Sequence, residues 1–305
     1  MSVGSLIKSI RINKGISQSE ACSNAVSQSN YSKFELEKID ISSSALIQII
    51  NNLDISLDEF FFLYDKENKN LINSLINRFF KIHINNPIEL IKFREEALDL
   101  LSLSNSKSEN NTLNRIVQLS YALEDIAKNE NYELAKKFAI PIWEYLQKND
   151  RWFLREIILL NTILYIFPIK TAHEIVKRSL RFLDDYENHN SHLLIKLNLH
   201  INFALLNIKE NDYKTAIEYL LNAINITSPH TYEFHKKTSQ LRLAYCKANL
   251  NEPFEEHLMS IVMYFTSTNS LPIFEQLKIE AKKYCVNPIF IQKLEHFEQK
   301  VKTIL

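Results

Sequence analysis

Glycine is almost absent from this chain: Gly4 and Gly15 are its only two glycines among 305 residues. Glycine supplies the positive φ angles that tight hairpin turns need and the close backbone approach that phosphate-binding loops need. A chain this poor in glycine cannot readily build a β-rich fold or a glycine-rich nucleotide loop. We therefore expect an all-α protein. Its 46% of hydrophobic and 24% of charged residues are typical of a globular chain.

Two similar dipeptides near the start of the chain predict helix entrances. Ser17-Gln18 and Ser27-Gln28 each place a serine where it can cap a helix, and Glu20 would complete a capping box with Ser17. Gly15 suits the end of the preceding helix. We expect helices over residues 5–14, from residue 18, over 28–35, over 43–53 and over 56–64. Only a turn fits between the second and third, so the pattern indicates a helix-turn-helix.

The third expected helix has an outer side of small polar and basic residues, because Tyr31 and Phe34 are spaced to anchor it from below. Were this unit to bind DNA, the start of the helix would face base edges and the other polar residues would mostly hold phosphates. The base-edge candidates are Gln28, Ser29 and Asn30, and the phosphate candidates are Lys8, Arg11, Gln18, Ser32 and Lys33. The alternative is a small capped helical bundle that binds no DNA.

The charge of the chain gives only weak support to DNA binding. The formal net charge is zero, and residues 1–38 hold five basic and three acidic residues, a net of +2. DNA-binding modules are usually more basic. If the unit binds double-stranded DNA, we expect modest affinity per subunit and a homodimer that combines two half-sites.

The segment SQSEACSNAVSQSNYSKFE (17–35) resembles the Xre/Cro-type helix-turn-helix, with one residue fewer between the helices than its commonest form. That spacing and LDISLDEFFFL (53–63) resemble the Rgg/MutR family of bacterial transcriptional regulators over about residues 4–64. The resemblance implies a cytoplasmic transcriptional regulator. The third helix differs from the family pattern, since it holds no arginine and Lys33 is its only base. Some members link two DNA-binding domains through a cysteine, a role that we do not assign to Cys22.

From about residue 66 the sequence is a series of amphipathic helical stretches separated by proline or asparagine-rich breaks. Helix pairs recur every ~38–42 residues, close to the period of tetratricopeptide arrays. The best repeat covers residues 197–229: the second helix begins at Tyr213, and Pro229 ends it. We expect a helix-turn-helix domain over residues 1–65. A tetratricopeptide-like α-solenoid for peptide sensing and dimerisation would follow over 66–305, with an irregular helical bundle as the alternative.

The concave face of a solenoid is lined by the first helix of each pair and suits an extended peptide. Mid-helix asparagines there could bond a peptide backbone or be satisfied within the fold. Arginine and histidine could meet a carboxylate, and aromatic residues could line the groove, although they are more often core residues. The candidates are Trp152, Arg155, Asn161, Asn198, Asn202, His235, Arg242 and Tyr245.

Residues 148–167, with a tryptophan before a helix containing Leu-Leu-Asn, resemble the middle of Rgg/MutR sensors. The resemblance implies that this region reads a short intracellular signalling peptide. Residues 288–305 resemble the terminal capping and dimer-forming elements of such proteins.

No pattern in the sequence indicates catalysis or a bound cofactor. Cys22, Cys246 and Cys285 lack metal-ligand spacing, so we expect reduced thiols and no metal. The sequence holds no apolar run of ~18 residues, so it does not predict a membrane span. Two functions remain: a peptide-responsive, quorum-sensing type of transcriptional regulator, or a helical-repeat interaction scaffold whose helix-turn-helix binds no DNA. An enzyme is not expected.

Overall fold

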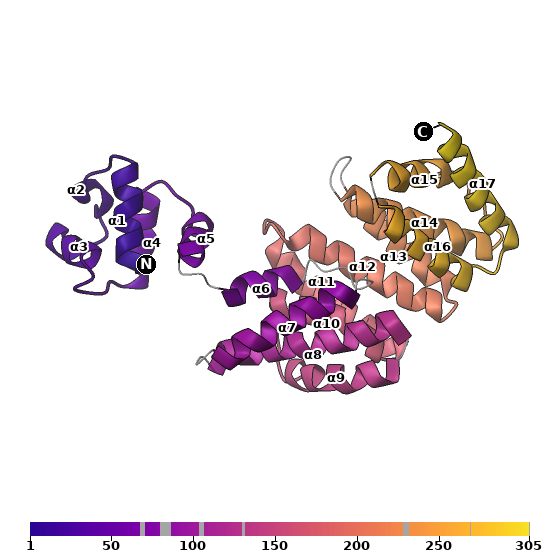
Figure 1. Cartoon of the computed structure of the whole chain (residues 1–305), viewed down its shortest axis with the longest axis horizontal. Coiled ribbons are helices and arrows are strands. Elements are labelled where there is room, and N and C mark those ends of the chain that lie inside the picture. Colours follow the sequence, from indigo (N-terminus) through magenta and orange to yellow (C-terminus); the bar gives the residue numbers. More distant parts are fainter. Residues whose placement is uncertain are drawn as a thin grey trace. The chain divides into compact units, whose positions relative to one another are not determined.

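A computed structural model describes residues 1–67, 71–79, 87–103, 107–129, 132–227, 232–268 and 270–304. All regular secondary structure in these ranges is helical, which confirms the predicted fold class (Figure 1). The chain forms two compact units, Met1–Ser120 and Tyr121–Leu305, which we treat separately. Across the same ranges, no helix combines the length and apolar character that crossing a membrane requires.

The first unit begins with five helices that confirm the sequence prediction, with ends that differ by at most three residues. They are α1 (Val3–Asn13), α2 (Gln18–Ala21), α3 (Gln28–Glu35), α4 (Ser43–Asn52) and α5 (Leu57–Glu67). A serine side chain caps each of them by accepting a hydrogen bond from the backbone N–H three residues later. The capping residues are Ser2, Ser17, Ser27, Ser42 and Ser56. The capping box of Ser17 and Glu20 is present as predicted.

Both glycines lie where a side chain would be costly. Gly15 has φ +68° just after α1, in the left-handed region where the sequence placed a helix end. At Gly4 an added Cβ would lie 2.2 Å from the carbonyl oxygen of Phe34. The backbones of α1 and α3 therefore approach closely, above a core that includes Ile7, Tyr31 and Ile49.

Three further helices complete the described part of the first unit: α6 (Leu71–Phe79), α7 (Pro87–Leu103) and α8 (Lys107–Asn129), the last of which continues into the second unit. Phe79 packs against Phe93 with ring centroids 5.0 Å apart, and Arg78 pairs with Glu96 at 2.7 Å. The domain boundary predicted from the sequence, after residue 65, falls near the end of α5 and inside this compact unit.

The second unit is a series of helix pairs. Its helices are α9 (Tyr132–Leu146), α10 (Leu154–Thr162), α11 (Ile169–Leu183), α12 (His192–Lys209), α13 (Tyr213–Ile226), α14 (Glu233–Asn249), α15 (Leu258–Ser267), α16 (Leu271–Tyr284) and α17 (Pro288–Ile304). Single 3₁₀ turns, η1 (Leu164–Ile166) and η2 (Asp184–Tyr186), follow α10 and α11. The helices α10, α12, α14 and α16 also pack on one another in sequence, so they form one layer of a tetratricopeptide-like solenoid. We call this layer the inner helices.

The best predicted repeat has the expected local structure. Asp212 caps α13 by accepting a hydrogen bond from the N–H of Thr215, and the small residues Ala204, Ala216 and Ala223 are fully buried. They let α12 and α13 pack closely. Pro229, predicted to end this repeat, lies outside the described residues. All three cysteines are buried and free.

Candidate functional site

Glu35, a buried carboxylate on α3, links the first three helices. Arg11 of α1 donates from Nε to Oε1 at 2.6 Å and from Nη2 to Oε2 at 3.0 Å, and Gln18 of α2 donates from Nε2 to Oε2 at 2.7 Å. Only 1% of the Glu35 side chain is exposed. Burial by itself would raise the pKa of Glu35, but the bonds from Arg11 and Gln18 outweigh it and hold the pKa below its ordinary 4.5. This network fixes α3 against α1 and α2.

The network gives Arg11 a different role from the one predicted. Its Nη1 also donates to the carbonyl of Ile16 at 3.0 Å, and only 12% of its side chain is exposed. A guanidinium committed to a buried carboxylate is poorly placed to hold a phosphate, so we withdraw Arg11 from the DNA contacts. Gln18 is half-buried, and the same carboxylate orients its amide.

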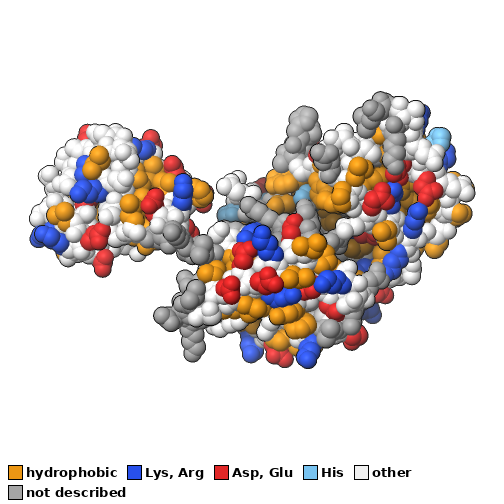
Figure 2. Space-filling view, viewed as in Figure 1, with side chains coloured by type: hydrophobic (Ala, Val, Ile, Leu, Met, Phe, Trp, Pro, Cys, Tyr) orange, Lys and Arg blue, Asp and Glu red, His pale blue; other side chains and the backbone are white. Residues whose placement is uncertain are grey.

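The outer side of α3 is open, as the sequence predicted. Gln28, Ser29, Asn30 and Lys33 are exposed, while Ser32 and Lys8 are half-buried. Amide, hydroxyl and ammonium groups on one exposed helix face can hydrogen-bond base edges and phosphates. Figure 2 shows acidic and basic side chains interspersed on the visible face of both units, in keeping with the zero net charge.

Three predicted asparagines lie on two inner helices that pack together. Asn198 and Asn202 lie four residues apart in the middle of α12, hence on one face, whereas Asn161 lies at the end of α10 and not in its middle. All three are half-buried. The Oδ1 atom of Asn161 is buried, and no group in the described part of the chain donates to it. A buried acceptor of this kind calls for a ligand or a water.

Two candidates on α14 have a structural role. Arg242 donates from Nε and Nη2 to the two oxygens of Glu280 on α16, both at 2.7 Å, and the phenol of Tyr245 donates to the same carboxylate at 2.9 Å. Burial raises the pKa of the Tyr245 phenol, which therefore stays protonated and donates. Arg242 and Tyr245 join two inner helices, and we withdraw both from the peptide contacts.

Trp152 is a third candidate that the structure places in the core. It is 2% exposed, its indole N–H donates to the carbonyl of Leu146 at 3.0 Å, and the guanidinium of Arg178 lies 4.2 Å from its ring centroid. Arg155, in contrast, is exposed on α10. His235 is half-buried, with its ring centroid 5.4 Å from that of Phe234.

Sequence reasoning missed three polar residues on α14. Thr238, Ser239 and Gln240 are buried, and Oγ1, Oγ and Oε1 have no hydrogen-bond partner within the described ranges. The only sequence signal for them is an uninterrupted polar run in a helix that is otherwise apolar at its centre. They add unpaired donors and acceptors to α14, an inner helix that packs on α12.

The comparisons agree with this architecture. Residues 98–250 match the C-terminal domain of the HTH-type transcriptional regulator Rgg, and residues 7–60 match a helix-turn-helix family. No protein of curated function matches the sequence.

Three solved structures show the same fold. A variant of the SHP pheromone receptor Rgg2 from Streptococcus dysgalactiae is 18% identical, with a TM-score of 0.67 over 93% of this chain and 99% of that one. PlcR from Bacillus thuringiensis, solved with the peptide PapR7 and DNA, is 17% identical, with a TM-score of 0.67 over 90% and 98%. PrgX in complex with cCF10 is 17% identical, with a TM-score of 0.62 over 93% and 92%. The fold and the matched families together assign this chain to the Rgg family of helix-turn-helix transcriptional regulators.

Proposed function

We propose that this transcriptional regulator binds operator DNA as a homodimer in the cytoplasm. A short signalling peptide in the concave groove of the repeat domain would control it, as in quorum sensing. The observation that carries the proposal is the exposed polar side of α3, held on a rigid base by Glu35. PlcR, a protein of the same fold, was solved with both a peptide and DNA.

DNA recognition would use the exposed residues of α3. Gln28, Ser29 and Asn30 would meet base edges, and Lys33 with the half-buried Lys8, Gln18 and Ser32 would contact phosphates. Because the bonds to Glu35 fix α3 before DNA arrives, little conformational freedom is lost on binding. The small excess of positive charge makes one subunit a weak binder, so two half-sites are needed.

A mobility-shift assay on the DNA that flanks the coding region tests this part. We expect retention at low salt, where phosphate contacts are strongest. Asn30→Ala should weaken retention, whereas Lys170→Ala, at an exposed site on α11, should not. If no DNA is retained at low salt, the proposal fails, and an interaction scaffold becomes the better description.

Peptide recognition would use the asparagines of the inner helices, with Arg155 and His235 available to acidic groups of the ligand. The orphaned Oδ1 of Asn161 would accept a backbone N–H of the peptide. Titration with synthetic peptides encoded beside the gene tests this part. Asn161→Ala should weaken binding about tenfold, the equivalent of about 1.4 kcal/mol. Asn222→Ala, at an exposed position on α13, is the matched control. Equal affinities for the two variants would remove Asn161 from the site.

A further inference from the structure

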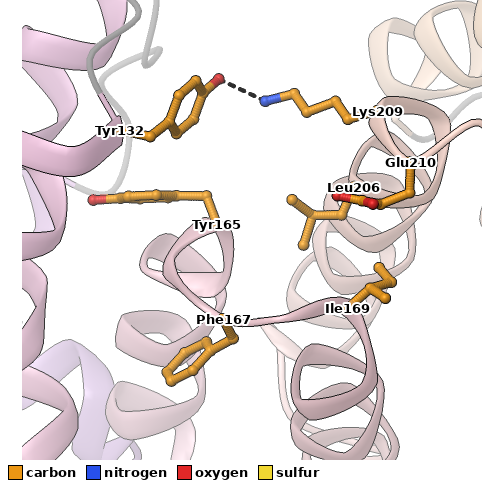
Figure 3. Close-up of a pocket in the computed structure, with 7 residues that line it drawn as sticks. All are labelled: Tyr132, Tyr165, Phe167, Ile169, Leu206, Lys209 and Glu210. Carbon is orange, nitrogen blue, oxygen red and sulfur yellow. Dashed lines mark hydrogen bonds between the residues drawn. The ribbon is translucent and has the colours of Figure 1, made fainter.

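A cavity of about 170 Å³ lies in the second unit where the end of α12 faces η1 and the start of α9 (Figure 3). Its lining includes Tyr132 of α9, Tyr165 of η1, Leu206 and Lys209 of α12, and Glu210, which follows α12 directly.

One part of the cavity is apolar. Tyr165, Phe167, Ile169 and Leu206 contribute to its lining, and in Figure 3 Leu206 lies opposite Tyr165. Phe167 is held edge-on against Trp143 with ring centroids 4.7 Å apart, and Tyr165 is held against Tyr132 at 5.9 Å. An apolar cavity of about 150 Å³ holds one benzene molecule. The whole cavity, at about 170 Å³, is therefore large enough for one residue with a side chain of the size of leucine or phenylalanine.

The other part of the cavity is polar and charged. The ammonium of Lys209 donates to the phenol oxygen of Tyr132 at 2.6 Å. The ammonium carries two further N–H groups and Tyr132 keeps its own O–H, so donors gather at this edge. Glu210, the next residue, contributes a carboxylate to the same lining. A ligand that fits both groups carries an anionic end and an N–H donor beside it.

The position of the cavity connects it to the inner helices. Asn202 and Leu206 lie four residues apart on α12, hence near one face of that helix, and Asn198 precedes them by about one more turn. The row that begins with the two asparagines therefore leads to the cavity. An extended peptide bonded to those asparagines would reach it with one end.

We propose that this cavity holds the C-terminal residue of the signalling peptide, an inference that rests on the proposed peptide control. The terminal carboxylate accepts hydrogen bonds from Lys209 and Tyr132, the last amide N–H donates to Glu210, and an apolar side chain lies against Tyr165 and Phe167. A precursor that continues beyond this residue has an amide in place of the carboxylate. The site then distinguishes a fully processed peptide from a longer one.

The probes for a test are N-acetyl-L-leucine, which mimics a C-terminal residue, and its uncharged amide, N-acetyl-L-leucinamide. Binding to the full chain is followed by ligand-observed NMR at concentrations up to about 10 mM, where fragments with millimolar affinity are detected. We expect the acid to bind at least tenfold more tightly than the amide. Lys209→Met should abolish this preference and Lys209→Arg should keep it. Lys214→Met, at an exposed site on α13, should leave it unchanged.

Equal binding of acid and amide, or no binding of the acid, overturns the proposal. Tighter binding of free leucine than of its acetyl derivative also overturns it, since that result indicates a free amino acid site. A second measurement separates this inference from the proposed function: the peptide encoded beside the gene, tested with a free and with an amidated C-terminus. If both forms bind equally, only the C-terminal site is wrong. If neither form binds, peptide control itself is wrong.

Discussion

Glu35→Gln is the most direct test of the view that a buried charge network fixes the recognition helix. Glutamine keeps the size of glutamate but places an N–H₂ donor where one carboxylate oxygen accepts. In the native unit that carboxylate receives two hydrogen bonds from Arg11 and one from Gln18. In the variant, the guanidinium stays buried without its counter-charge, and at least one donor faces another donor.

The size of the effect follows from this geometry. Hydrogen bonds to a charged group contribute about 1.5–3 kcal/mol, and removal of one partner of a buried ion pair costs about 3–5 kcal/mol. Because glutamine retains one acceptor for Arg11, we expect a loss of about 2–4 kcal/mol. Domains have about 0.05–0.15 kcal/mol of stability per residue, so helices α1–α5 have a total of about 3–10 kcal/mol. The variant therefore loses a large part of it.

Hydrogen–deuterium exchange on the full chain measures this loss within α1–α3, because exchange reports the free energy of local opening. A change of about 2–4 kcal/mol corresponds to a loss of protection of roughly 30- to 700-fold. Glu37→Gln is the matched control, since Glu37 is exposed and accepts its bond from Ser5 at the surface. If Glu35→Gln reduces protection less than threefold, or no more than the control does, the carboxylate does not stabilise α3 and our reasoning is refuted.

Four further predictions follow from the same structure. The pKa of Glu35 lies below its ordinary 4.5, so the folded unit favours the charged form. The contribution of Glu35 to stability should be complete above about pH 4.5 and lost as the pH falls through its folded pKa. Helices α1–α3 of the wild type should lose exchange protection over that pH range, and Glu35→Gln should show no such loss. Lys33→Ala should reduce the slope of log affinity against log salt for operator DNA by about 0.9 per subunit, and an unchanged slope would exclude Lys33 as a phosphate contact. Gly4→Ala should destabilise α1–α3 by about 1–3 kcal/mol, measured by the same exchange, because the added methyl lies 2.2 Å from a carbonyl oxygen of α3; unchanged protection would show that the two helices separate freely. Arg242→Met should destabilise the second unit by about 3–5 kcal/mol in urea unfolding followed by tryptophan fluorescence. The double variant Arg242→Met with Glu280→Leu should recover most of this loss. A double variant as unstable as the single one would contradict the ion-pair account.

The sequence predicted the parts of the fold that depend on neighbouring residues. The caps at Ser17, with Glu20, and at Ser27 act within one helical turn, so residue spacing alone predicted where the two helices begin. The same is true of Gly15, and of Asp212 at the start of α13. The exposed polar side of α3 was also predicted, since the 3.6-residue period separates it from Tyr31 beneath.

The site predictions that the structure argues against concern charged and aromatic residues, and the two arginines among them have partners far away in the chain. Arg11 meets Glu35 24 residues later, and Arg242 meets Glu280 38 residues later. The sequence alone does not show whether either arginine faces solvent or a buried carboxylate. For Trp152 the sequence left both the groove and the core open, with the core favoured for aromatic residues, and the packing places it in the core.

By itself, then, the sequence determined that this protein is all-α, with a helix-turn-helix followed by helical repeats, because caps, breaks and apolar periodicity act over a few residues. The tertiary structure decided which polar groups are left for a ligand. Packing brings Glu35 and Glu280 to two predicted binding arginines, and it leaves Asn161 with an unmatched carbonyl oxygen. It also places Tyr132 beside Lys209, 77 residues apart, at one cavity. A polar side chain is available to a ligand only where the protein itself supplies no hydrogen-bond partner for it, and this depends on which helices pack together. Residue spacing along the chain does not encode the packing of distant helices.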